Sequence, residues 1–217
     1  MFLNLYHYAG NNPIKYIDPD GRFLYISGDE DFMRDVKTNL QELSPDALVI
    51  KIEDDLAMVL LSGEEVDSEH SEGAKLLSSL VTDINNTVTI KKNNNGNKYK
   101  SSTNEVLFDL NSDPTILTMQ SYGFSRYEIG RPNYIGLGHE LVHALHDIKG
   151  LMNRVDYYTD VIGLDGRNKH YDDNHGNGII YEEFATVGGI NGFSYGDNYP
   201  TENTIRAEHG LKLRANY

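Results

Sequence analysis

The sequence predicts one α+β domain with a mixed β-sheet and a buried helix that carries the candidate site. Three observations favour this fold class. Strand-like and helix-like segments alternate in the first half of the chain, a strongly helical pattern follows between residues 133 and 149, and 217 residues with 39% hydrophobic content suffice for one substantial core. We therefore predict a domain at residues 23–217, preceded by a separate boundary segment at residues 1–22.

The first half of the domain is expected to supply most of the sheet. Runs of β-branched, aromatic and other apolar residues predict strands at residues 23–27, 47–52, 56–61 and 87–91. Acidic starts and apolar residues at helical spacing predict helices at residues 29–43 and 68–84. The Asn-rich stretch 93–97 predicts a turn that brings the chain back in a hairpin, with the second strand at residues 105–110.

A longer helix is expected between Pro132 and Gly150. Proline is favourable at the start of a helix, and glycine is common directly after its end. Apolar side chains recur inside this segment at roughly helical spacing, namely Ile135, Leu137, Leu141, Val142, Leu145 and Ile148. The helix is therefore expected to be amphipathic and largely buried.

Residues 139–143 of this helix read His-Glu-Leu-Val-His, which is the HExxH pattern. Residues four positions apart lie on one face of a helix about one turn apart, so His139 and His143 can reach a single Zn²⁺. Glu140 is offset around the helix and can accept a proton from the attacking water without binding the metal. The pattern is that of a zinc-dependent peptidase. The alternative is a core helix with two hydrogen-bonded histidines.

A catalytic zinc site usually has three protein ligands and one open position. The best candidate for the third ligand is Glu183, which lies in a short helix-like segment that ends at two glycines, residues 188 and 189. Its neighbour Glu182 is then expected to fix a histidine ligand through the second ring nitrogen. The alternative is that both acids complement the dipole of a helix start.

Two motifs resemble a known family. The segment 139–146 (HELVHALH) and the segment 182–189 (EEFATVGG) resemble the NleD-like effector zinc peptidases and, more distantly, the clostridial neurotoxin light chains. The resemblance covers roughly residues 100–217. It implies a zincin-like metallopeptidase fold of the gluzincin type, with Glu183 as the third zinc ligand. It also implies that residues 106–110 form the sheet edge that pairs with extended substrate.

The last residues of the chain are candidates for the remaining catalytic groups. Residues 203–217 resemble the tail of the effector peptidases, which closes with an arginine and a tyrosine. The resemblance implies that Arg214 and Tyr217 stabilise the negative charge that develops on the carbonyl oxygen during hydrolysis. The alternative is that Arg214 is a surface charge and Tyr217 anchors the end of the chain.

The first residues resemble the last segment of Rhs or YD-repeat shells. The match lies at residues 4–21, NLYHYAGNNPIKYIDPDG, in which Asp18-Pro19-Asp20-Gly21 corresponds to the DPxG mark of the junction with a toxin domain. The resemblance implies a secreted toxin that a larger Rhs protein delivers into a target cell, with self-cleavage near the junction. A cognate immunity protein would then be a partner. The alternative is an ordinary Tyr-rich strand and turn.

Composition narrows the function classes. The net charge of −14 repels phosphate backbones, so nucleic acid is not expected as a partner. The chain has no cysteine, so the metal ligands have to be histidines and carboxylates. It has no apolar run of the ~18 residues that a membrane span needs, and no signal peptide is expected at its start.

Two further groups are weaker candidates. His146 follows His143 by three residues, and we expect it to support the site or the helix end rather than to bind zinc. Residues 168–178 contain His170 and His175 beside two aspartates; a second metal site or a nuclease motif is possible there, but a solvated loop is favoured. The sequence thus predicts a zinc-dependent endopeptidase that acts as a secreted toxin or effector on a target-cell protein. A metal-dependent nuclease toxin and a non-catalytic Rhs tip module are the alternatives.

Overall fold

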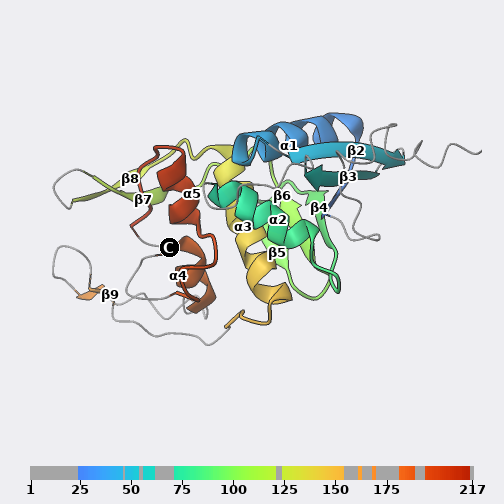
Figure 1. Ribbon diagram of the computed structural model, residues 1–217. Helices are drawn as coiled ribbons and strands as arrows, with labels where there is room; N and C mark the ends of the chain where they lie inside the picture. Colours follow the sequence, from blue (N-terminus) through green and yellow to red (C-terminus); the bar gives the residue numbers. More distant parts are fainter. Residues whose placement is uncertain are drawn as a thin grey trace, which may run out of the picture.

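The computed structural model describes residues 24–45, 47–53, 56–61, 71–120, 124–153, 161–162, 168–169, 181–188 and 194–215 (Figure 1). The strands are β1 (Leu24–Ser27), β2 (Ala47–Glu53), β3 (Leu56–Leu61), β4 (Val88–Lys92), β5 (Lys98–Lys100), β6 (Glu105–Phe108), β7 (Ile116–Met119), β8 (Ser125–Glu128), β9 (Val161–Ile162) and β10 (Asn168–Lys169). The helices are α1 (Glu30–Leu43), α2 (Glu72–Val81), α3 (Asn133–Ile148), α4 (Tyr181–Val187) and α5 (Glu202–Glu208). The predicted boundary segment, the histidines at 170 and 175, and Tyr217 lie outside the described residues. Within the described ranges, no helix has the length and apolar character that crossing a lipid bilayer requires.

The described part of the chain is an α+β fold built on a mixed six-stranded sheet in the order β2-β3-β1-β4-β6-β5. β1 lies antiparallel to β3 and parallel to β4, and β4 is in turn parallel to β6. Helix α1 connects β1 to β2, and α2 connects β3 to β4. Helix α3 packs against both of these helices and against β5 and β6. The three helices therefore lie together beside the sheet (Figure 1).

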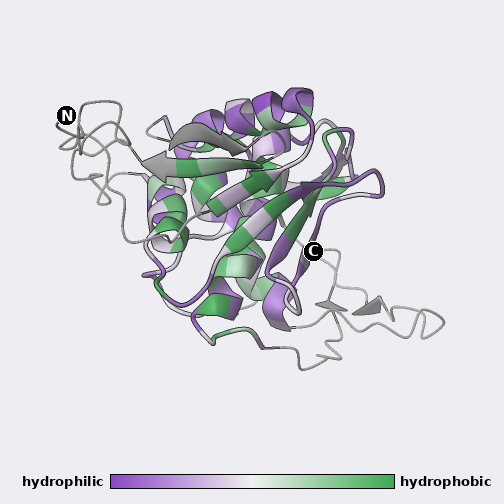
Figure 2. Cartoon of the chain, turned by 90° about the vertical axis from the view of Figure 1, so that its right-hand side faces the viewer, coloured by the Kyte–Doolittle hydropathy of each residue, from purple (hydrophilic) through white to green (hydrophobic). Residues whose placement is uncertain are grey.

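Alternation along the strands explains which face of the sheet the helices cover. In β1, Leu24 and Ile26 are fully buried, whereas Tyr25 and Ser27 are only partly buried. Strands β4 and β6 have the same alternation of buried and partly buried residues. Hydrophobic and hydrophilic residues accordingly alternate along these strands in Figure 2. One face is therefore apolar and forms the floor of the core.

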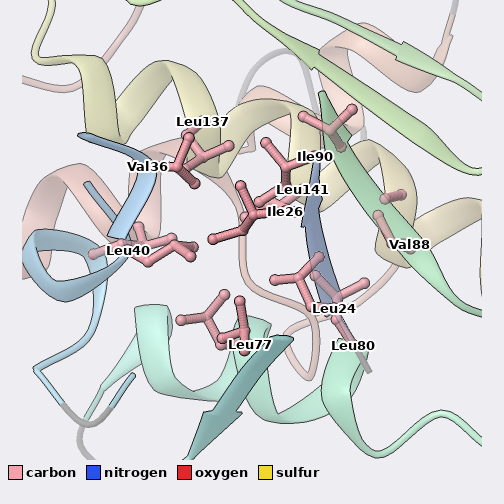
Figure 3. Close-up of a cluster of buried hydrophobic side chains, with 14 of the residues drawn as sticks. Leu24, Ile26, Val36, Leu40, Leu77, Leu80, Val88, Ile90, Leu137 and Leu141 are labelled. Carbon is pink, nitrogen blue, oxygen red and sulfur yellow. The ribbon is translucent and has the colours of Figure 1, made fainter. Parts of the chain in front are cut away.

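The core between this face and the helices fixes the orientation of α3. The contributing side chains labelled in Figure 3 are Leu24, Ile26, Val36, Leu40, Leu77, Leu80, Val88, Ile90, Leu137 and Leu141. Each fully buried leucine contributes on the order of 2 kcal/mol. Because Leu137 and Leu141 face this core, the opposite face of α3, which carries His139 and His143, is turned away from the sheet.

The predicted elements of the first half agree with the structure at β1, α1, β2, β3 and β4. The second predicted helix is too long at its C-terminal end, because α2 ends at Val81 and Ile84 is 57% exposed. The reason is the carboxylate of Asp83. Its Oδ1 accepts hydrogen bonds from the backbone N–H groups of Asn85 and Asn86, which stabilises a turn in place of further helix.

The predicted pairing after β4 is wrong. β6 lies parallel beside β4, and the hairpin is formed by β5 and β6 instead, with Lys98 opposite Leu107. Because β6 is bonded on both sides, the expected substrate-pairing edge at residues 106–110 is also wrong, and β5 occupies that edge. The hydroxyl of Tyr99 in β5 donates a 2.9 Å hydrogen bond to Asp147 of α3, which holds the strand in this place.

A second, smaller sheet was not predicted from the sequence. Strands β7 and β8 form an antiparallel ribbon that lies beside α5 in Figure 1. The other edge of β7 bonds to the C-terminal segment: the N–H of Met119 donates to the carbonyl of Leu213, and Thr118 pairs with Arg214. This pairing fixes the position of Arg214 against the rest of the domain.

Candidate metal centre

The centre is built on α3. The helix begins directly after Pro132, and Gly150, with a φ of 67°, follows its C-cap. All residues from 135 to 146 are buried. One face of the helix packs on the core, and α4 and α5 pack against it elsewhere. The polar side chains of α3 are therefore enclosed by protein.

Two imidazoles and one carboxylate converge on a single point. The Nε2 atoms of His139 and His143 lie 3.1 Å apart. Oε2 of Glu183 in α4 lies 3.0 Å from Nε2 of His143 and 3.5 Å from Nε2 of His139. All ligand atoms of this cluster lie within 4.8 Å of one another. Tetrahedral zinc with bonds of ~2.0–2.1 Å separates its ligand atoms by about 3.3 Å, so the cluster has the dimensions of a zinc site.

The other ring nitrogen of each imidazole faces a carboxylate. Nδ1 of His139 lies 2.9 Å from Oε2 of Glu202. Nδ1 of His143 lies 2.9 Å from Oε1 of Glu182. Since each Nδ1 donates its hydrogen to a carboxylate, each Nε2 carries a lone pair in the neutral ring. Two lone pairs and the Glu183 carboxylate thus meet at one point, an arrangement that favours a cation between them.

Glu202, the first residue of α5, is fully buried. Besides the imidazole of His139, its carboxylate binds two guanidinium groups: Nε of Arg206 donates to Oε1 at 2.7 Å, and Nη1 of Arg214 donates to Oε2 at 2.9 Å. Burial raises the pKa of Glu202, but the hydrogen bond with His139 and the arginine charges outweigh burial. The pKa of Glu202 therefore lies well below its ordinary value, and the group is a carboxylate.

Glu182 is the second buried carboxylate behind the cluster. Its Oε1 accepts from Nδ1 of His143 and lies 2.8 Å from Nδ1 of His146. The hydroxyl of Thr186 donates to Oε1 at 3.0 Å, and the hydroxyl of Tyr195 donates to Oε2 at 2.8 Å. Burial raises the pKa of Glu182, but the two histidines outweigh it and lower the pKa to about 2. Glu182 thus has the contact expected of it, and His146 shares this carboxylate and lies outside the ligand cluster.

The acids also set the protonation of the cluster. Burial lowers the pKa of His143, but hydrogen bonds to Glu182 and Glu183 outweigh burial and raise the pKa to about 10. Burial raises the pKa of Glu183, but hydrogen bonds with His139 and His143 lower it well below its ordinary value. The cluster therefore stabilises a positive charge, for which a proton and a metal ion compete.

Glu140 lies next to the cluster and is 7% exposed. No group in the described part of the chain donates a hydrogen bond to its carboxylate. Helical side chains lean toward the N-terminus of their helix, so this carboxylate extends toward the turn that contains Gly136. A buried carboxylate without a protein donor is unusual and is available to accept a proton beside the cluster.

Gly188 and Asn203 hold α4 and α5 together. Gly188 has a φ of 80°, and a Cβ at this position would collide with the side chain of Thr201, the N-cap of α5. Nδ2 of Asn203 donates to the carbonyl of Gly188 at 2.9 Å and to the carbonyl of Arg214 at 3.0 Å. These contacts explain why a glycine follows the helix that carries Glu183.

The structure brings most of the predicted site residues together. His139, His143 and Glu183 form the cluster, and Glu140 lies beside them. Arg214 is 8% exposed and contacts Glu202. It is therefore connected to the cluster through a carboxylate and is not itself part of it.

Sequence reasoning missed Glu202, Arg206, Tyr195 and Thr186. Arg206 and Thr186 each contact an acid four positions earlier in their own helix, but that acid's role comes from a histidine in α3, which no local pattern shows. The acid at the start of α5 follows the capping residue Thr201, where it equally fits simple complementation of a helix dipole. Only the contact with an imidazole gives it a role in the site.

Comparison with known proteins identifies the family to which the chain belongs. The sequence profile of the Peptidase M91 family, described as an effector protein, matches residues 20–217. No curated protein and no solved structure matches the chain. The matched range contains every described element and the whole cluster of two histidines and one glutamate. The chain therefore belongs to the Peptidase M91 family of effector proteins.

Proposed function

We propose that this member of an effector peptidase family is a zinc-dependent endopeptidase that cleaves a protein of the target cell. In this proposal His139, His143 and Glu183 hold Zn²⁺. The observation that carries it is the convergence of two Nε2 atoms and one carboxylate oxygen, at separations of 3.0, 3.1 and 3.5 Å. Two imidazoles and one carboxylate are a ligand set that catalytic zinc takes in metallopeptidases.

Glu140 is the proposed general base. Bound zinc supplies a Lewis acid that raises the acidity of a water molecule and polarises the carbonyl of the scissile bond. Glu140 accepts a proton from the attacking water and then donates a proton to the leaving nitrogen. The absence of a protein donor to its carboxylate among the described residues supports this role, since no internal hydrogen bond has to break first. Glu182 and Glu202 hold both imidazoles in the tautomer whose Nε2 lone pair faces the metal position.

Arg214 and Tyr217 are the proposed stabilisers of the negative charge on the carbonyl oxygen. For Arg214 the support is its burial close to the cluster, since its guanidinium shares the carboxylate of Glu202 with His139. This ion pair also gives Arg214 a second task, which is to hold Glu202 in place. Tyr217 lies outside the described residues, and its proposed role rests on the resemblance of the C-terminal tail alone.

We also propose a delivery route. Residues 4–21 resemble the end of an Rhs or YD-repeat shell, which supports secretion as cargo of a larger Rhs protein, with residues 1–22 as the remnant of the junction. An effector peptidase delivered in this way meets its protein substrate inside the target cell. If that cell is a competing bacterium, a cognate immunity protein with a basic surface would suit the net charge of −14.

The experiment that tests the peptidase compares purified parent, Glu140→Gln and His143→Ala proteins. Zinc content is measured by elemental analysis, and new protein termini are counted by mass spectrometry after incubation with a target-cell lysate. The parent and Glu140→Gln proteins should carry stoichiometric zinc, and His143→Ala should lose it. Only the parent should create new termini.

The matched control is Glu42→Gln, which changes an exposed glutamate of α1 and should behave as the parent does. Cleavage by Glu140→Gln at the rate of the parent would refute the proposed mechanism. Degradation of plasmid DNA with Mg²⁺, undiminished in Glu140→Gln, would instead favour a nuclease. A zinc-free parent with no cleavage would favour a non-catalytic interaction module.

A further inference from the structure

A second group of polar atoms lies one helical turn from Glu140. The side chains of Asn97 and Arg131 meet above Gly136 of α3. A Cβ at Gly136 would lie 2.6 Å from Nδ2 of Asn97 and 2.7 Å from Nη2 of Arg131. Because Gly136 has no side chain, the amide of Asn97 and the guanidinium of Arg131 can lie directly against the backbone of α3. Both groups are hydrogen-bond donors.

Neither donor has an acceptor in the described part of the chain. Arg131 forms no ion pair there, and its Nε is buried without a hydrogen-bond partner. Oδ1 of Asn97 accepts a 2.8 Å hydrogen bond from the backbone N–H of Asp109, which orients the amide so that Nδ2 faces Arg131. Folded proteins pair almost all of their buried polar groups. Nε of Arg131 is an exception to this rule, whereas Asn97 and the rest of the Arg131 side chain are only partly buried. A ligand that enters next to the candidate active site would supply the acceptor that the described residues lack.

The charges around this place favour an anion. Helix α3 has no acidic residue in its first turn and no side-chain cap, so the positive end of its dipole is not compensated there. Burial lowers the pKa of Arg131, and the nearby carboxylates of Glu202 and Glu140 oppose this effect only in part. Within the described ranges, neither carboxylate comes close enough to Arg131 to form an ion pair. A bound carboxylate would supply the missing partner.

We propose that Arg131 and Asn97 bind the carboxylate of an Asp or Glu side chain of the substrate, one or two residues from the scissile bond. The inference rests on the proposed peptidase function. A guanidinium offers several donors in one plane, which fits a planar carboxylate, and the amide of Asn97 adds a further donor beside it.

The position of the two donors selects a flanking side chain over the scissile carbonyl. Gly136 and Glu140 are separated by one helical turn, about 5.4 Å along the axis. An extended substrate advances ~3.3 Å per residue. For a substrate that runs along the axis of α3, the donors at Gly136 lie about one or two residues away from the bond that the water activated by Glu140 attacks.

The net charge of −14 opposes the binding of a substrate that is acidic overall, because like charges repel each other at long range. The preference therefore concerns one position of the substrate. It does not make the enzyme selective for acidic proteins in general.

The first test compares cleavage sites of the parent with those of Arg131→Met, which removes the charge and keeps a long side chain. New termini in a target-cell lysate are sequenced by mass spectrometry, with Arg126→Met, at an exposed arginine of β8, as the matched control. The parent and the control should share an enrichment of Asp or Glu at one position near the cut. Arg131→Met should lose this enrichment and still bind zinc.

Two outcomes would overturn the inference and leave the peptidase proposal intact: cleavage by the parent without an acidic preference, or an unchanged preference in Arg131→Met. The absence of any cleavage that depends on Glu140 would overturn the proposed function and this inference with it.

A second measurement keeps the inference testable if Arg131→Met fails to fold. A substrate identified in the lysate is prepared with its acidic residue changed to the corresponding amide. With the parent enzyme, kcat/KM should fall about tenfold to a hundredfold, mainly through a higher KM, because the lost contact is made in the bound substrate. In folded Arg131→Met the same substrate change should have a much smaller effect, because only the contact with Asn97 is left. An equal kcat/KM for both substrates with the parent would refute the inference.

Discussion

Oε2 of Glu202 and Nδ1 of His139 lie 2.9 Å apart, although the two residues are separated by 63 positions in the sequence. Glu202 is held in turn by Arg206 from its own helix and by Arg214 from the C-terminal segment. The orientation of the His139 imidazole thus depends on three residues that lie more than 60 positions later in the sequence. This dependence can be measured.

Replacing Glu202 with glutamine should weaken zinc binding by about tenfold to a hundredfold, because His139 loses the carboxylate that fixes its ring and tautomer. The same change removes a buried negative charge that contacts the guanidinium groups of Arg206 and Arg214, and it should lower the free energy of unfolding by about 3 kcal/mol. Zinc affinity is measured by competition with a chelator, and stability by urea denaturation. Glu42→Gln is the matched control. Equal zinc affinities of Glu202→Gln and Glu42→Gln would contradict the prediction.

His146 provides a test of which histidines bind the metal. It shares the Glu182 carboxylate with His143 but is not part of the ligand cluster. We expect His146→Ala to keep stoichiometric zinc, whereas His143→Ala should lose it. Elemental analysis after dialysis measures both. Loss of zinc from His146→Ala in a protein of unchanged circular dichroism would show that the ligand set is different.

Gly73 tests how closely α2 packs on the end of α1. A Cβ at this position would collide with the backbone carbonyl of Leu43, which cannot rotate away. Gly73→Ala should therefore lower the free energy of unfolding by about 3 kcal/mol.

Gly138→Ala is the matched control for this packing, since the nearest atom to its Cβ would be the flexible Cδ1 of Leu43 at 3.2 Å. The helix propensity of alanine offsets this tight contact, so its stability should stay within about 1 kcal/mol of the parent. Urea denaturation measures both variants. Similar stabilities of Gly73→Ala and Gly138→Ala would contradict the predicted collision.

The free energy of unfolding should depend on pH through Asp83, a residue far from the metal cluster in the sequence. Burial raises its pKa, but hydrogen bonds from Lys149, Asn85 and Asn86 outweigh burial and keep the pKa below the ordinary 3.8. A carboxylate with a lowered pKa stabilises the folded state above its unfolded pKa, and this contribution is lost as the pH falls through the folded pKa. Asp83→Asn should cost about 1–2 kcal/mol at pH values near ~7. The difference from the parent should shrink below pH 3.8.

Urea denaturation of the parent and Asp83→Asn proteins at about pH 7 and about pH 3 measures this linkage. A difference in the free energy of unfolding that is the same at both pH values would show that the charge of Asp83 does not contribute.

Elements with local signals could be predicted from the sequence. The acidic start predicted for the helix at residues 29–43 has its counterpart in the structure, where Asp29 is the N-cap of α1 and accepts a hydrogen bond from the N–H of Phe32. The spacing of His139 and His143 is also local, because one helical turn brings them together. Glu183 was chosen as the third ligand from its helix-like segment, and the resemblance to effector peptidases gave it the same role; it lies in the cluster of the structure.

Contacts between distant segments could not be predicted in the same way. Alternation shows that β4 and β6 each have one buried face, but it does not show that they are parallel neighbours with β5 outside them. The partner of His139 was missed for the same reason, since an acid at a helix start has an ordinary local explanation. Arg214 was expected at the reacting carbonyl. Its contact with Glu202 could not be predicted, because it depends on the pairing of the C-terminal segment with β7.

The order in which the chain is synthesised gives the Glu202 contact a further consequence. A ribosome produces α3 well before α5 and the segment that pairs with β7. A nascent chain therefore already carries His139 while Glu202, which supports its imidazole, and the two arginines bound to Glu202 are still missing. The complete centre can therefore assemble only late in translation. Until then, His139 has no carboxylate that fixes its ring with Nε2 toward the cluster.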